Sequence, residues 1–167
     1  MDPKFISAFV KSISNVFTTM LQLPVEVGEP TIKKGDENPF DVSGIIGMSG
    51  EVVGSVVLCF PGDTAERIVA IFTGEQMGID SDDFPDAIGE LVNMVAGGAK
   101  GMFDDREVSI SCPSVIVGQG HSVSRLKDVP SVLIPCSTDC GEVVIEVAIQ
   151  DRKKTETADA STASASA

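Results

Sequence analysis

The sequence has 167 residues, and 43% of them are hydrophobic, which is enough to form the core of one domain. Twenty-five acidic residues against twelve basic ones give a formal net charge of −13. Nucleic acids and anionic membranes are bound by clustered lysines and arginines, so this charge argues against both as partners. No stretch approaches the ~20 apolar residues of a membrane span, and the first residues lack a signal-peptide pattern, so we expect a cytoplasmic protein.

The first predicted element is a helix that begins at Pro3 and ends before Pro24. Apolar residues at helical spacing predict one buried stripe, formed by Ile6, Phe9, Val10, Ile13, Val16, Phe17 and Met20. The residues predicted to face water are Lys4, Ser7, Lys11, Ser14 and Thr18.

Strands and two further helices follow along the chain. Strands are predicted at 25–33, 40–48 and 51–60, the last two joined by a hairpin turn at Ser49-Gly50. Asp63 and Glu66 have the spacing of a capping box at the start of a short helix that Gly74 closes. A long helix is predicted over 85–103, followed by strands at 107–117, 123–134 and 141–149.

The two parts of this pattern resemble each other. Each has a long helix, a strand that contains proline, and a final strand built on the same phrase, Gly50-Glu51-Val52-Val53 and Gly141-Glu142-Val143-Val144. An alignment of the long helices places Ser12 beside Glu90 and Asn15 beside Asn93. We therefore predict a two-layer α+β fold of duplicated helix-plus-sheet units, with long helices packed on a largely antiparallel sheet. This domain spans residues 1–150, and the Ala-, Ser- and Thr-rich tail at 151–167 is predicted to be disordered.

The four cysteines are Cys59, Cys112, Cys136 and Cys140. The first two lie in apolar, strand-like segments and are predicted to be buried thiols. Cys136 and Cys140 have the spacing of half a zinc site, but the only histidine is His121 and there is no second close pair. We favour reduced structural thiols over metal binding. The segment Gly118-Gln119-Gly120-His121 is predicted to be a hairpin or loop, and His121 has no evident serine or cysteine partner.

The third helix carries four small or polar residues on one face. Asp86, Glu90, Asn93 and Gly97 follow one another at i+4, i+3 and i+4 steps, which places them opposite the buried stripe of Ile88, Leu91, Val92, Val95, Ala99 and Met102. Gly97 and Gly98 predict a shallow surface and close approach by another backbone, because glycines inside a helix cost about 1 kcal/mol each. Glu90 and Asn93 either solvate the helix or position a water, since no nucleophile or histidine accompanies them.

The segment Ala87-Ile88-Gly89-Glu90-Leu91-Val92-Asn93-Met94 resembles the signature helix of the CheC/CheX/FliY phosphatases. That signature is an acidic or serine residue, three residues, then Glu-x-x-Asn, with a proline downstream for which Pro113 is the candidate. The order of elements over residues 1–150 and the single Glu-x-x-Asn helix are similar to the CheX members.

The resemblance implies a phosphatase that removes the phosphoryl group from the aspartate of a CheY-type receiver domain. Asn93 would orient the attacking water and Glu90 would pair with a lysine of the receiver. Asp86, Met94, Gly97 and Gly98 would border the docking surface. Magnesium would belong to the receiver, and this chain would bind no metal. The resemblance also implies a homodimer with one site per chain, on the third helix. The alternative is a non-catalytic interaction module that only binds a phosphorylated receiver.

Overall fold

The computed structural model describes residues 1–36, 38 and 40–165. Its helices are α1 (Pro3–Leu21), α2 (Gly62–Thr73), α3 (Phe84–Lys100) and α4 (Arg152–Ala165). Its strands are β1 (Glu26–Val27), β2 (Thr31–Ile32), β3 (Val42–Gly50), β4 (Val52–Phe60), β5 (Val108–Ile110), β6 (Ser114–Val117), β7 (Val132–Thr138) and β8 (Gly141–Asp151).

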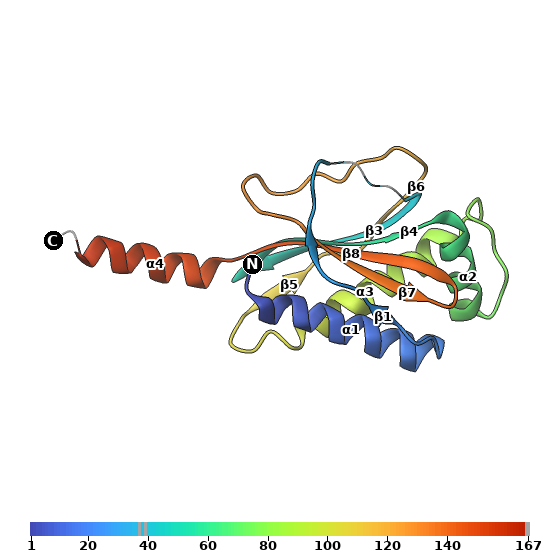
Figure 1. The fold of residues 1–167 in the computed structure, drawn as a ribbon, viewed down its shortest axis with the longest axis horizontal. Coiled ribbons are helices and arrows are strands. Elements are labelled where there is room, and N and C mark those ends of the chain that lie inside the picture. Colours follow the sequence, from blue (N-terminus) through green and yellow to red (C-terminus); the bar gives the residue numbers. More distant parts are fainter. Residues whose placement is uncertain (37, 39, 166–167) are drawn as a thin grey trace.

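The strands form one antiparallel sheet in the order β1-β7-β8-β4-β3-β5, with β2 also paired to β7 and β6 also paired to β3. Helices α1 and α3 lie side by side on one face of this sheet, and α2 covers the same layer at one end (Figure 1). The apolar core lies between these layers and includes Phe5, Phe9, Phe17, Ile46, Val56, Ile88, Leu91 and Ile145. The predicted two-layer α+β fold is confirmed.

The two halves exchange their first strands. Strands β1 and β2 of the first half pair with β7 of the second, while β5 and β6 of the second half pair with β3 of the first. The central strands β4 and β8 pair with each other along their length. The repeated phrase has a backbone reason, because Gly50 and Gly141 both take positive φ values, 108° and 129°, where a side chain is strained. This arrangement fits the predicted duplication.

The predicted alignment of the two long helices is wrong by one residue. Buried residues of α1 correspond to buried residues of α3 at the same sequence separation, which is that between Phe5 and Phe84. The further pairs are Ala8 with Ala87, Phe9 with Ile88, Ser12 with Leu91, Ile13 with Val92, Val16 with Val95 and Phe17 with Ala96. Ser12 is fully buried, so it cannot correspond to the exposed Glu90. By burial, Lys11 stands where Glu90 stands and Ser14 where Asn93 stands. The predicted stripe of α1 otherwise holds, except that Met20 is 51% exposed and Leu21 is buried instead.

Several predicted strands and one cap differ from the structure. The strand predicted at 25–33 is two short strands, and the strand predicted at 107–117 is broken between β5 and β6. Most of the segment predicted as a strand at 123–134 is a loop, because Asp128 takes a left-handed φ of 66° and Pro130 removes a backbone donor. Glu66 does not close a capping box, since its Oε1 accepts from the Ile79 N–H at 3.0 Å. Gly74 closes α2 with a φ of 77°, as predicted.

The face of the sheet away from the helices is covered by the β2–β3 and β6–β7 connections (Figure 1). Buried polar groups lie beneath these connections. Lys33 Nζ and Glu146 Oε2 form an ion pair of 2.7 Å, with side chains only 5% and 6% exposed. Because Glu146 alternates with the core residues Ile145 and Val147 along β8, it points to this second face. A buried charge of this kind requires its partner.

The tail beyond residue 151 is helical where disorder was predicted. Helix α4 projects away from the sheet (Figure 1), and its residues from Arg152 to Ser161 are exposed. The segment has no glycine or proline and is rich in alanine, which allows a helix to propagate without packing. An ion pair connects its first turn to the sheet, because Lys153 Nζ lies 3.4 Å from Glu51 Oε1.

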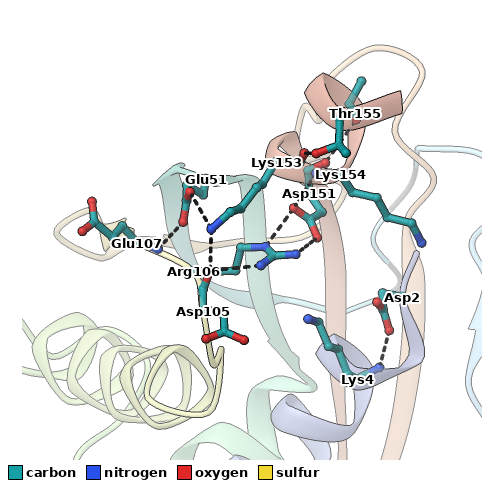
Figure 2. Close-up of polar contacts among 11 residues, drawn as sticks. Asp2, Lys4, Glu51, Asp105, Arg106, Glu107, Asp151, Lys153, Lys154 and Thr155 are labelled. Carbon is teal, nitrogen blue, oxygen red and sulfur yellow. Dashed lines mark hydrogen bonds and ion pairs between the residues drawn. The ribbon is translucent and has the colours of Figure 1, made fainter. Parts of the chain in front are cut away.

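A polar cluster joins three segments at this end of the sheet (Figure 2). Arg106 donates from Nε and Nη2 to both carboxylate oxygens of Asp151, at 3.0 and 2.9 Å. These hydrogen bonds hold the pKa of Asp151 below its ordinary value. Glu51 accepts from the Glu107 N–H at 2.7 Å, which lowers the pKa of its carboxyl. The cluster therefore fixes the segment that leaves α3 against the ends of β4 and β8.

Candidate functional site

Helix α3 is the element that carries the candidate site. Pro85 lies in its first turn, where no intrahelical hydrogen bond is lost. The predicted buried stripe is confirmed for Ile88, Leu91, Val92, Val95 and Ala99, whereas Met102 lies beyond the helix and is 39% exposed. The stripe fixes the rotation of the helix, so the opposite face points outward.

Asp86, Glu90 and Asn93 lie together on that outward face. Asp86 and Glu90 are exposed and Asn93 is partly exposed. Across the described residues, no hydrogen bond or ion pair engages the Glu90 carboxylate or the Asn93 amide. A partner can therefore reach both groups without breaking an existing contact. The structure thus places the three residues as the motif spacing predicted.

A shallow hollow of about 430 Å³ lies beside these residues, lined by Pro85, Asp86, Gly89, Glu90, Pro113 and Val115. Pro113 precedes β6 and packs directly over Gly89. A Cβ added to Gly89 would lie 3.2 Å from Pro113 Cγ, so the contact depends on the absence of a side chain there. The hollow is thus bounded by α3 on one side and by the β5–β6 connection on the other.

Gly97 and Gly98 have different surroundings. A Cβ at Gly97 would meet nothing within 4 Å, so this residue continues the open face of Asn93. A Cβ at Gly98 would instead fall 2.4 Å from Ser12 Oγ of α1. Ser12 Oγ donates to the Val95 carbonyl at 2.7 Å, so α1 approaches α3 closely here. The predicted close approach is therefore that of α1 to α3, and the absence of a side chain at Gly98 allows it. Met94 is partly buried and packs against the edge of the core.

The chemistry available at this face is limited to a carboxylate pair and an amide. Among the residues that line the hollow there is no serine, cysteine, histidine or lysine to form a covalent intermediate. Glu90 can pair with an incoming cation, and Asn93 can donate and accept hydrogen bonds to a water. The exposed Asp82 and Asp83 add negative charge at the start of the helix. The face is thus suited to a partner with a positive group.

The family model described as "Chemotaxis phosphatase CheX" matches residues 42–137, which contain α3 and Pro113. The chain belongs to the CheX family. A CheC-like superfamily protein from Shewanella sp. PV-4 is 34% identical, with a TM-score of 0.81 over 90% of this chain and 99% of that one. The CheY-P phosphatase CheX of Thermotoga maritima is 28% identical over 122 residues, 71% of this chain and 79% of that protein. A CheX-CheY-BeF3-Mg2+ complex from Borrelia burgdorferi, 24% identical, shares the fold with a TM-score of 0.74 over 87% of this chain and 97% of that one.

His121 has a serine partner that sequence reasoning did not find. Its Nε2 lies 2.7 Å from Ser43 Oγ and its Nδ1 2.7 Å from the Gly118 carbonyl. Because a carbonyl only accepts, Nδ1 carries the proton and the Ser43 hydroxyl donates to Nε2. Ser43 is fully buried and also accepts from Asn38 Nδ2 at 2.6 Å. This pair holds the β6–β7 connection on the sheet.

The cysteines are free thiols rather than disulfides. Burial raises the pKa of both Cys59 and Cys136 to about 11, so each is a neutral thiol at pH 7. Cys112 is exposed, against the prediction, because it lies in the break between β5 and β6. In the part of the chain that the structure describes, no three His, Cys, Asp or Glu residues gather as a metal site, and no helix is long and apolar enough to cross a membrane.

Proposed function

We propose that the protein hydrolyses the aspartyl phosphate of a CheY-type receiver domain at the α3 face. The observation that carries the proposal is the pair of unengaged side chains, Glu90 and Asn93, one helical turn apart beside the Pro113 hollow. Family membership supports the reaction class, and the Thermotoga maritima relative is named a CheY-P phosphatase. The face offers positioning groups and no nucleophile among the residues that line the hollow, which fits transfer of a phosphoryl group to water.

In this mechanism Asn93 holds a water in line with phosphorus. The water oxygen forms a bond to phosphorus while the bond to the aspartate oxygen breaks, which releases inorganic phosphate and restores the carboxylate. Because the transition state is loose, the water needs orientation more than deprotonation, and an amide is sufficient. Orientation of this kind contributes about 100-fold in rate.

Glu90 fixes the position of Asn93 by pairing with the receiver's lysine. Magnesium belongs to the receiver in this proposal, in agreement with the Mg2+ named in the Borrelia burgdorferi complex with CheY. Asp86 and Gly97 border the docking surface, since both lie on the same exposed side of α3. Met94 and Gly98 contribute indirectly, because their contacts are with the core and with α1.

We further propose that the protein acts in the cytoplasm as a homodimer. The sheet ends in short strands, β1 and β2 at one edge and β5 and β6 at the other, which leave unpaired backbone groups for a second copy. Light scattering at micromolar concentration should give the mass of two chains. A mass of one chain would reject the dimer and leave the α3 site untouched.

The proposed activity is tested by turnover of a phosphorylated receiver with catalytic amounts of protein. Glu90→Ala and Asn93→Ala should reduce turnover about 100-fold while the free energy of unfolding stays within ~0.5 kcal/mol of wild type, because both side chains lack partners. Asn15→Ala is the matched control, since Asn15 is an exposed helical asparagine on α1 and should not affect turnover. A protein that acts only in stoichiometric amounts would be a binding module, and equal losses in Asn15→Ala and Asn93→Ala would reject the site.

A further inference from the structure

Helix α1 presents a second copy of the α3 face. In the register set by burial, Ser7, Lys11 and Ser14 stand where Asp86, Glu90 and Asn93 stand. The exposure of each pair agrees: Ser7 and Asp86 are exposed, Lys11 and Glu90 are exposed, and Ser14 and Asn93 are partly exposed. Both helices lie side by side in one layer on the same face of the sheet (Figure 1). At these three positions the two helices share their exposure and differ in chemistry.

The main chemical difference is the charge at the central position. Lys11 places an ammonium group where α3 has the Glu90 carboxylate. Across the described chain, Lys11 forms no ion pair or hydrogen bond, so its charge is not neutralised by a neighbour. It is also one of only twelve basic residues in a chain with a net charge of −13. The chain as a whole would attract a basic partner surface, whereas the Lys11 ammonium group repels one locally.

Ser7 and Ser14 are smaller than their counterparts on α3, whereas Val10 and Thr18 of α1 occupy the positions of Gly89 and Gly97. Ser7 satisfies a position that accepts an acidic or serine residue in the motif, and Ser14 is smaller than asparagine. The side chains at the other two positions, Ser7 and Ser14, are too small to cover Lys11. A receiver that docks through a lysine therefore meets a like charge on α1 at the position of Glu90, in addition to the bulk of Val10 and Thr18.

We propose that Lys11 is a specificity-determining residue that excludes the receiver from the α1 face and confines docking to α3. This inference rests on the proposed function, because it takes the receiver's lysine as the partner of Glu90. Like charges that face each other across an interface oppose association, and opposite charges at the same distance favour it. Reversal of the charge at residue 11 therefore has a larger effect than removal of it.

The test is calorimetric binding of a Mg2+- and BeF3-loaded receiver that the wild-type protein dephosphorylates. The wild-type chain should bind one receiver. Lys11→Glu should bind a second, and in a Glu90→Ala/Asn93→Ala background it should restore binding about tenfold over that background. About 1 M salt, where the Debye length is ~3 Å, should remove the gain. Lys4→Glu is the matched control, since it makes the same charge change on the exposed side of α1, two turns earlier.

The outcomes separate the two proposals. If Lys11→Glu binds no more receiver than Lys4→Glu, while wild type binds and turns over normally, the role of Lys11 is overturned and the proposed function stands. If wild type neither binds nor dephosphorylates any phosphorylated receiver, the proposed function itself fails. Equal gains from Lys11→Glu and Lys4→Glu would show a general charge effect and would also overturn the specific role of Lys11.

Discussion

Two adjacent glycines of α3 should respond in opposite directions to the same substitution. Alanine is favoured over glycine inside a helix by about 1 kcal/mol. At Gly97 the added methyl group meets nothing within 4 Å, so Gly97→Ala should stabilise the fold by about 0.5–1 kcal/mol. At Gly98 the methyl group would lie 2.4 Å from Ser12 Oγ, which must rotate away and lose its bond to the Val95 carbonyl.

The cost at Gly98 exceeds the gain in helix propensity. A buried hydroxyl left without a partner costs about 1–3 kcal/mol, so Gly98→Ala should destabilise by about 1–2 kcal/mol in total. Urea unfolding followed by circular dichroism measures both changes. In a Ser12→Ala background the clash with Oγ is absent, and Gly98→Ala should become close to neutral. The reasoning is refuted if Gly98→Ala costs the same with and without Ser12, or if Gly97→Ala destabilises.

The activity of these variants separates docking from folding. Gly97 lies beside Asn93 on the open face, so Gly97→Ala should raise the KM for the phosphorylated receiver although the fold is more stable. Gly98→Ala should leave KM unchanged at temperatures where it remains folded. A Gly97→Ala protein with unaltered KM would place residue 97 outside the docking surface.

Two further predictions concern the charged pairs. Lys33→Met should lower the free energy of unfolding by about 3–5 kcal/mol, because it leaves the Glu146 carboxylate buried without its partner, and Lys33→Met/Glu146→Leu should recover most of the loss in urea titrations. If the double variant were as unstable as the single one, burial of an unpaired charge would not be the cause. Because Arg106 depresses the pKa of Asp151 below 3.8, this pair stabilises the fold above about pH 4 and loses its effect as pH falls through the lowered pKa. Arg106→Gln should therefore be less stable than wild type at pH 7, and thermal melts should show this difference shrinking below pH 4; a constant difference would point to lost packing.

The candidate site was predictable because its information is local. Helical spacing alone places Asp86, Glu90 and Asn93 on one face, and the buried stripe opposite them decides which face is outward. The β3–β4 hairpin was predictable for the same reason, since its turn and both strands are contiguous. The position of Pro113 needed the structure, because only packing shows that it lies over Gly89.

The errors arose where distant residues decide the outcome. The predicted alignment placed Ser12 beside the exposed Glu90, yet the Ser12 hydroxyl is buried against Val95, 83 residues away. His121 seemed to lack a partner because Ser43 is 78 residues earlier in the chain. The helix α4 was missed because its composition gives no apolar face, and only its helix propensity predicts its form.

The exchange of strands gives the first half of the chain a structural part in the site, although that half carries no copy of the motif. Strand β3 belongs to that half, and both β5 and β6 depend on it for their backbone hydrogen bonds. The wall of the hollow that Pro113 forms is therefore held in place by β3, a strand from the half that has no Glu-x-x-Asn. Neither half can bury its sheet edge alone, so a gene that encoded only the second half would produce a chain with exposed, unpaired strands. The half that lacks the motif therefore still supports one wall of the hollow beside the motif.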